Sequence, residues 1–140
     1  MSITIPDSVT SIGTNAFIGC SGLEIIIVES GNTVYCSEGN CLIETASGKL
    51  ILGCKNSVIP DGVKSVGEYA FYDCANLTSI TVPSSVTSIG AGAFCYCTNL
   101  ETITFKGTEE QWNSITKGSS WDSNAGSGTP SGKYNLIFEK

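Results

Sequence analysis

The sequence contains no histidine, and this absence excludes much of the chemistry on which active sites depend. Histidine is the usual general base near neutral pH, the partner of serine and cysteine nucleophiles, and the commonest zinc ligand. Neither a Walker-type phosphate loop nor a glycine-rich dinucleotide motif occurs in the chain. We therefore expect a protein that is not an enzyme and holds no cofactor or metal, with a carboxylate-dependent hydrolase as a remote alternative.

Charged residues are also scarce. They make up 14% of the chain, with a net charge of −6 and no cluster of lysine or arginine. A surface of this kind offers nothing to a phosphate backbone or an anionic lipid, so nucleic acid is excluded as a partner. The 19 serines and 14 threonines supply hydroxyl groups to solvate the surface instead. This composition is typical of an extracellular or cell-wall protein.

The longest apolar run is Ala93 to Cys97, far short of the roughly 20 residues that a membrane-spanning helix needs. We expect no membrane insertion in this segment. Met1 leads directly into patterned sequence without a signal peptide. We therefore expect a piece of a longer chain, or a mature fragment, located outside the cell or on its surface.

A repeat with a period of about 23 residues dominates what is present, and a constant period of this length is the signature of a solenoid. Phe71 recurs at Phe94 and Cys74 recurs at Cys97, and further Pro, Leu and Ile pairs keep the same spacing. Another copy begins at Ile5. It precedes the next by one period plus an insertion that lies between Glu29 and Val58.

Each copy predicts the same path. The stretch from Leu77 to Pro83 alternates apolar and polar residues and predicts a short strand centred on Ile80 to Val82. VTSIG predicts a second short strand, with Val86 and Ile89 inward, and AFxxC predicts one helical turn. Stacked copies then bury two columns, formed by Phe17, Phe71 and Phe94 and by Leu23, Leu77 and Leu100.

The repeated pattern IPxxVxxIGxxAFxxCxxLxxIxI resembles the BspA-like, or Treponema pallidum type, leucine-rich repeat. The resemblance covers nearly the whole chain, including the insertion and the KGTEEQWN segment at the C-terminal side. It implies a leucine-rich-repeat-like solenoid, mainly of short β-strands with short helical turns, on the bacterial cell surface. It also implies adhesion to host proteins or other bacteria, and no catalytic or ligand residues.

The insertion itself predicts a β-hairpin, with strands over Cys41 to Thr45 and Lys49 to Leu52. Ile25 and Ile27 stand at outward positions of the first copy's strand, where the other copies have Ser or Thr. One interpretation is that the hairpin covers these two residues or extends this end of the sheet. The other is that they form an exposed apolar contact patch.

The C-terminal segment predicts a small capping helix. Thr108 and Gln111 fit a capping box, and Trp112 and Ile115 give an amphipathic helix running to about Lys117. A loop with Trp121 packed back on the solenoid, and a last strand over Tyr134 to Phe138, complete the chain. We thus expect a single domain over 1–140, with repeats at about 3–28, 59–81 and 82–105, the hairpin insertion at about 29–58 and a cap at 106–140.

The seven cysteines predict no zinc site, because no CxxC pair occurs. Cys20, Cys74 and Cys97 occupy equivalent repeat positions, where we expect buried, inert thiols. Cys36, Cys41 and Cys54 belong to the insertion, and Cys95 is expected in an outward position. A single bridge from Cys36 to Cys41 is an open alternative.

The leading hypothesis is a noncatalytic interaction or adhesion module that binds a protein or glycan on a host or neighbouring cell. The candidate contact face comprises the outward strand residues Ile25, Ile27, Ser79, Thr81, Thr102 and Thr104. A passive structural spacer in an extracellular stalk is the alternative. The first coil is expected to expose Ile3, Ile5, Val9 and Ile12, through which the chain could self-associate.

Overall fold

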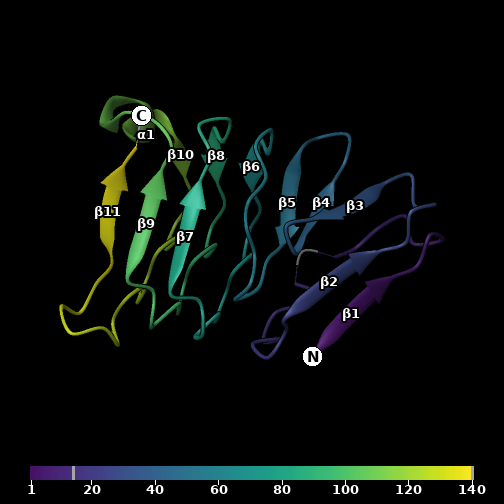
Figure 1. The fold of residues 1–140 in the computed structure, drawn as a ribbon, viewed down its shortest axis with the longest axis horizontal. Coiled ribbons are helices and arrows are strands. Elements are labelled where there is room, and N and C mark those ends of the chain that lie inside the picture. Colours follow the sequence, from purple (N-terminus) through teal and green to yellow (C-terminus); the bar gives the residue numbers. More distant parts are fainter. Residues whose placement is uncertain (14, 140) are drawn as a thin grey trace.

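A computed structural model describes residues 1–13 and 15–139 and shows a solenoid whose strands follow one another along its long axis (Figure 1). The elements in chain order are β1 (Ser2–Ile5), β2 (Ile25–Val28), β3 (Tyr35–Glu38), β4 (Cys41–Glu44), β5 (Lys49–Leu52), β6 (Ser65–Val66), β7 (Ser79–Val82), β8 (Ser88–Ile89), β9 (Thr102–Phe105), α1 (Glu109–Ser114), β10 (Thr116–Lys117) and β11 (Asn135–Phe138). The leucine-rich-repeat fold class predicted from the repeat is confirmed in its short strands and little helix.

The strands form one two-stranded, one three-stranded and one six-stranded sheet within the described residues. β1 pairs with β2, and β7, β9 and β11 form a parallel sheet with β9 in the middle. The six-stranded sheet has the order β10-β8-β6-β5-β4-β3, parallel from β10 to β5 and antiparallel from β5 to β3. Each coil therefore lays its strands beside the equivalent strands of the next coil.

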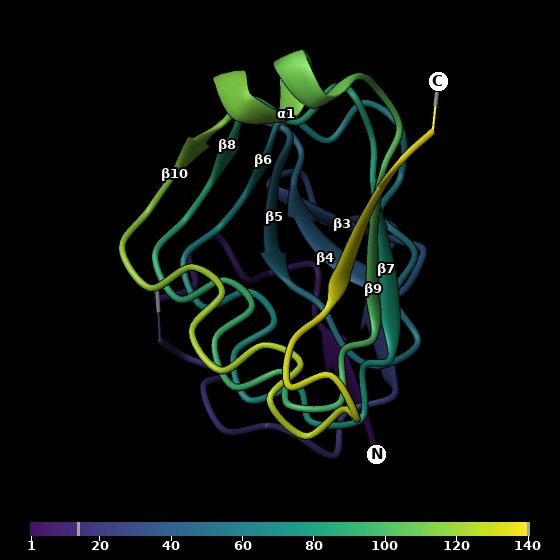
Figure 2. The same ribbon diagram turned by 90° about the vertical axis from the view of Figure 1, so that its left-hand side faces the viewer.

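The coils have three sides when seen along the solenoid (Figure 2). The strands β6, β8 and β10 lie on one side, and β7, β9 and β11 lie on another. The segments that connect these sides form the third, which we call the turn wall, comprising residues 15–22, 67–76, 90–99 and 118–128. The predicted helical turn at AFxxC is wrong, since these segments are consecutive turns.

Hydrogen bonds between coils explain why no helix forms there. The amides of Phe71 and Phe94 donate to Ala93 and Trp121 carbonyls of the next coil at 2.8 and 2.7 Å, while alternate amides close local turns. The prediction that the phenylalanine and cysteine of each AFxxC segment lie on the same side is nevertheless right for the second and third copies. Their side chains are all buried: Phe71, Cys74, Phe94 and Cys97. The rings of Phe71 and Phe94 stack with centroids 5.0 Å apart.

The hairpin is confirmed, and it is larger and more deeply buried than predicted. β3 adds a strand that the sequence pattern did not reveal, and β5 pairs in parallel register with β6. Residues of β4 and β5 are divided between two core clusters: Cys41, Ile43 and Leu50 belong to the C-terminal one, and Leu42 and Leu52 belong to the N-terminal one. The hairpin is therefore a partition with a core on each side.

The coil that contains the hairpin has no turn wall. After β5, residues 53–57 cross directly toward the next coil, and the amide of Gly53 donates to the Ala70 carbonyl. A Cβ on Gly53 would lie 2.1 Å from Cε1 of Phe71, so only glycine leaves room for this ring. The phenylalanine column thus ends against the Gly53 backbone and does not continue to Phe17.

Four predictions for the first copy are wrong. Phe17 is only partly buried and Cys20 is exposed, because no coil stacks on their turn-wall segment. Leu23 is buried, but in the N-terminal cluster and not in one column with Leu77 and Leu100. The residues of the VTSIG segment described by the structure, 9–13, form no strand.

Side chains of the hairpin tie the first coil to the rest. The amide of Val28 donates to Oγ of Ser37 at 3.0 Å, so the free edge of β2 is satisfied by a side chain and not by a strand. Nδ2 of Asn32 donates to the carbonyls of Pro6 and Val9 at 2.9 and 3.0 Å. Polar contacts of this kind fix the position of the first coil without extending either long sheet.

The C-terminal segment does more than cap the solenoid. Its capping box is confirmed, since Thr108 and Gln111 exchange hydrogen bonds. The helix ends at Ser114 and not near Lys117, because Ile115 is extended and the chain continues as β10 beside β8. Trp121 packs back as predicted, with its ring centroid 6.2 Å from that of Phe94. With β11 beside β9, this segment adds a strand to both long sheets.

Truncation of two equivalent phenylalanines tests where the column ends. Phe71→Ala should lower the free energy of unfolding by about 3–5 kcal/mol, because it removes a fully buried ring and leaves a cavity. Phe17→Ala, the matched control, should cost at most about 2 kcal/mol, since that ring is only partly buried. Urea unfolding of both variants measures the difference. Equal losses would contradict a column that stops at Gly53.

Candidate functional site

The outward residues of β7 and β9 form a regular polar surface. Ile80, Val82, Ile103 and Phe105 alternate with them and are buried, which turns the intervening side chains outward. Parallel register places Ser79 beside Thr102 and Thr81 beside Thr104. The four predicted contact residues of these strands are therefore brought together on one face.

β11 extends this surface with two residues that the sequence analysis did not include. Asn135 pairs with Thr102, and Ile137 pairs with Thr104 with 46% of its surface exposed. The predicted strand over residues 134–138 carried the signal, since its alternation already separates outward from inward positions. We call these six residues, Ser79, Thr81, Thr102, Thr104, Asn135 and Ile137, the outer face.

Ile25 and Ile27 do not join the outer face. They lie on β2, which pairs only with β1 among the described strands. Each retains 46% of its surface, so of the two interpretations, cover by the hairpin is wrong and exposure is right. The hairpin contacts β2 from the buried side, where Ile26 is 3% exposed. Ile25 and Ile27 thus form a separate, exposed apolar pair.

The thiols of the core are poorly suited to act as nucleophiles. Burial raises the pKa of Cys41 and of Cys74 to about 12, and it also raises the pKa of Cys97. The Cys97 thiol also donates to the Phe71 carbonyl, with Sγ 3.0 Å from the oxygen. At neutral pH these groups are protonated, and a protonated thiol neither attacks nor binds a metal ion efficiently.

The remaining cysteines correct two expectations. Cys95 is buried and not outward, and burial raises its pKa as well. All seven cysteines are free, and Cys36 pairs across the hairpin with Ile43 and not with Cys41. The bridge left open by the sequence is therefore not formed in this structure.

Other polar groups near the C-terminal coil are satisfied internally. Nζ of Lys117 donates to the carbonyls of Trp112 and Ile115 at 2.8 and 3.3 Å, and desolvation lowers the pKa of this lysine. The Tyr134 hydroxyl donates to Asp122 at 2.8 Å, and burial together with this bond raises the tyrosine pKa. The described residues contain no group of three or more His, Cys, Asp or Glu side chains placed to hold a metal ion.

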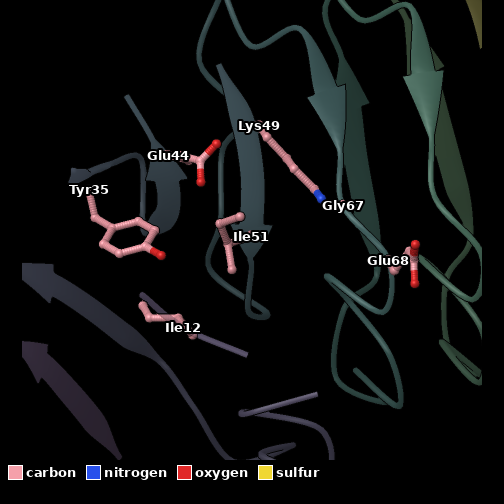
Figure 3. A pocket seen from close by; sticks show the side chains of 7 residues that line it. All are labelled: Ile12, Tyr35, Glu44, Lys49, Ile51, Gly67 and Glu68. Atoms are coloured by element: carbon pink, nitrogen blue, oxygen red, sulfur yellow. The ribbon is translucent and has the colours of Figure 1, made fainter. Parts of the chain in front are cut away.

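A small pocket lies between the first coil, the hairpin and the coil of β6 (Figure 3). It has a volume of about 130 Å³ and is lined by Ile12, Tyr35, Glu44, Lys49, Ile51, Gly67 and Glu68. Figure 3 shows Glu44 and Glu68 on opposite sides of β5.

None of the helices described by the structure combines the length and apolar character needed to cross a bilayer. The only helix described within residues 1–13 and 15–139, α1, runs for 6 residues.

Comparison with known proteins agrees with this fold. Residues 1–51 and 49–119 match the family described as "BspA type Leucine rich repeat region (6 copies)". A search of curated proteins returned no match. Among solved structures, the chain resembles a leucine-rich repeat protein from Eubacterium ventriosum, with 25% identity, a TM-score of 0.59, and coverage of 91% of this chain and 40% of the other. It resembles the pneumococcal vaccine antigen PcpA in fold, with 24% identity, a TM-score of 0.59, and coverage of 74% and 29%.

The chain thus spans less than half the length of either solved protein. Its matched residues and its solenoid architecture support a protein-interaction repeat module, a class that is typically noncatalytic. On the extent of the match, the chain belongs to the BspA-type leucine-rich repeat family.

Proposed function

We propose that this chain is a noncatalytic adhesion module of a bacterial cell-surface protein, and that it binds a protein or glycan through the outer face. The single observation that carries the proposal is the in-register array of exposed and partly exposed side chains on β7, β9 and β11. The similarity to PcpA, described as a vaccine antigen, supports a surface location.

The geometry of the outer face suits recognition of an extended polar ligand. Neighbouring parallel strands lie about 4.8 Å apart, so Thr81 and Thr104 present hydroxyls at a fixed spacing. Each hydroxyl both donates and accepts a hydrogen bond, as peptide groups and sugar hydroxyls require. Ile137 adds an exposed apolar group at the end of the same row. A rigid array of this kind binds with little loss of conformational entropy.

Introducing charge on the outer face tests the proposal. The double variant T81E/T104E places two carboxylates side by side across β7 and β9, where they repel each other and reject an uncharged polar ligand. We expect the affinity for immobilised extracellular-matrix proteins or for a glycan array to fall tenfold or more. A tenfold loss corresponds to roughly 1.4 kcal/mol of binding free energy. Surface plasmon resonance and array fluorescence measure the effect, and circular dichroism checks folding.

The matched control is T116E, which alters an exposed threonine on β10 of the other long sheet. It should bind as the parent does. If the parent binds nothing across the panel, the chain is a passive spacer and the proposal fails. Equal loss in T116E and T81E/T104E would show that charge alone, and not the outer face, determines binding.

We further propose that copies of the chain associate through the N-terminal end. β1 is an edge strand, and Ile3, Val9 and Ile12 are only partly buried, whereas Ile5 is covered. Unpaired strand edges beside apolar side chains favour pairing with another chain. Three of the four side chains that the sequence predicts to be exposed in the first coil are therefore partly accessible, and Ile5 is not.

Light scattering over a range of concentrations measures this association. The average mass should rise above that of one chain as concentration increases, and Ser2→Lys should reduce the rise, because a lysine on an edge strand disfavours pairing. A strictly monomeric mass at high concentration would contradict the proposal.

A further inference from the structure

Three tyrosines form a contiguous aromatic cluster on the turn wall. The ring centroids of Tyr69 and Tyr72 are 5.5 Å apart, and those of Tyr72 and Tyr96 are 5.6 Å apart, both in edge-to-face geometry. Tyr96 is 43% exposed, and the other two are partly exposed. None of the three hydroxyls makes a hydrogen bond to another of the described residues. The cluster thus presents ring faces and free hydroxyls to solvent.

Two of these tyrosines occupy backbone positions that favour small residues. Coil-to-coil hydrogen bonds align two columns of residues with positive φ on the turn wall. One column contains Tyr69, Gly92 and Ser120, and the other contains Asp73, Tyr96 and Asn124. Glycine, asparagine and aspartate tolerate this left-handed conformation, whereas a bulky side chain is strained there.

Backbone conformation therefore does not favour Tyr69 and Tyr96. At equivalent positions the same chain uses Gly92 and Asn124, which fit the turn with less strain. The Tyr69 ring packs against Gly92 of the next coil, where a Cβ would lie 2.5 Å from Cε1 of that ring, so the glycine leaves room for the tyrosine. Strain retained at exposed positions points to a binding role.

The charge of the turn wall indicates the kind of partner. Its four segments, residues 15–22, 67–76, 90–99 and 118–128, contain the acidic residues Glu68, Asp73 and Asp122 and no lysine or arginine. Asp122 is bonded to Tyr134, whereas Glu68 is exposed and Asp73 partly exposed. An acidic surface with exposed tyrosine rings is complementary to a cation that can also stack.

We infer that the tyrosine cluster binds an arginine-bearing segment of a partner protein. A guanidinium group stacks on tyrosine faces and forms paired hydrogen bonds with carboxylates, which a lysine ammonium does less well. Tyrosine is also enriched among residues that dominate protein interfaces. The cluster lies on a different side of the coil from the outer face, so this inference stands independently of the proposed function.

The double variant Y69N/Y96N separates binding from folding. Asparagine accepts positive φ, so the melting temperature should stay the same or rise. Affinity for a synthetic oligo-arginine peptide, measured by isothermal titration calorimetry at low salt, should fall by about tenfold with two stacking faces removed. Unchanged affinity in this variant would overturn the inference.

Two controls sharpen the result. Asn124→Gly changes a residue of the same positive-φ column without removing an aromatic ring, and it should leave peptide affinity unchanged. An oligo-lysine peptide of equal length should bind the parent more weakly than the arginine peptide. Equal binding of both peptides would show charge attraction alone, and binding of a neutral oligosaccharide in place of the arginine peptide would show a glycan site. Either outcome, or no peptide binding by the parent, would contradict an arginine-specific surface.

Discussion

Stacking between coils is the constraint on which the rest of the structure depends. One coil of this repeat cannot bury its own phenylalanine or satisfy its own turn-wall amides. Phe71 and Phe94 obtain both from a neighbour, through ring stacking and through hydrogen bonds to Ala93 and Trp121. Where a neighbouring coil has a turn wall, the residues are buried and ordered in columns. Where it has none, as beside Phe17, the same sequence motif remains partly exposed.

The hairpin changes the solenoid by interrupting this stacking. Because residues 53–57 skip the turn wall, β1 and β2 lie apart from the sheet of β7, β9 and β11, and the core divides at β4 and β5. The division also changes which outward residues lie together. Ile25 and Ile27 are removed from the outer face, whereas the C-terminal segment extends that face with β11. The proposed outer face is therefore confined to the C-terminal coils.

Sequence periodicity predicted the structural features that depend on one repeat and on neighbouring repeats of the same length. The burial of Phe71, Leu77 and Ile80, and the outward direction of Thr81 and Thr104, follow from alternation and from the constant repeat spacing. The exposure of Cys20 could not be predicted in this way. It depends on a missing turn wall in the next coil, and the length of an insertion does not reveal which part of a coil it replaces.

The tyrosine cluster escaped prediction for a different physical reason. The direction of Tyr69 and Tyr96 is set by positive φ values, which a sequence signals only when glycine or asparagine occupies the position. Both columns become visible only once hydrogen bonds align the coils. The sequence therefore does not reveal this candidate surface, because a tyrosine does not signal the positive-φ turn that it occupies.

Hydrogen exchange at individual turn-wall amides tests the dependence on stacking most directly. The amides of Phe71 and Phe94 donate to the next coil, whereas the Phe17 amide makes no such bond to a described residue. Measured by NMR in the native state, Phe71 and Phe94 should exchange only through large-scale unfolding, and Phe17 should exchange far faster through local opening. Protection of Phe17 equal to that of Phe71 and Phe94 would contradict the account.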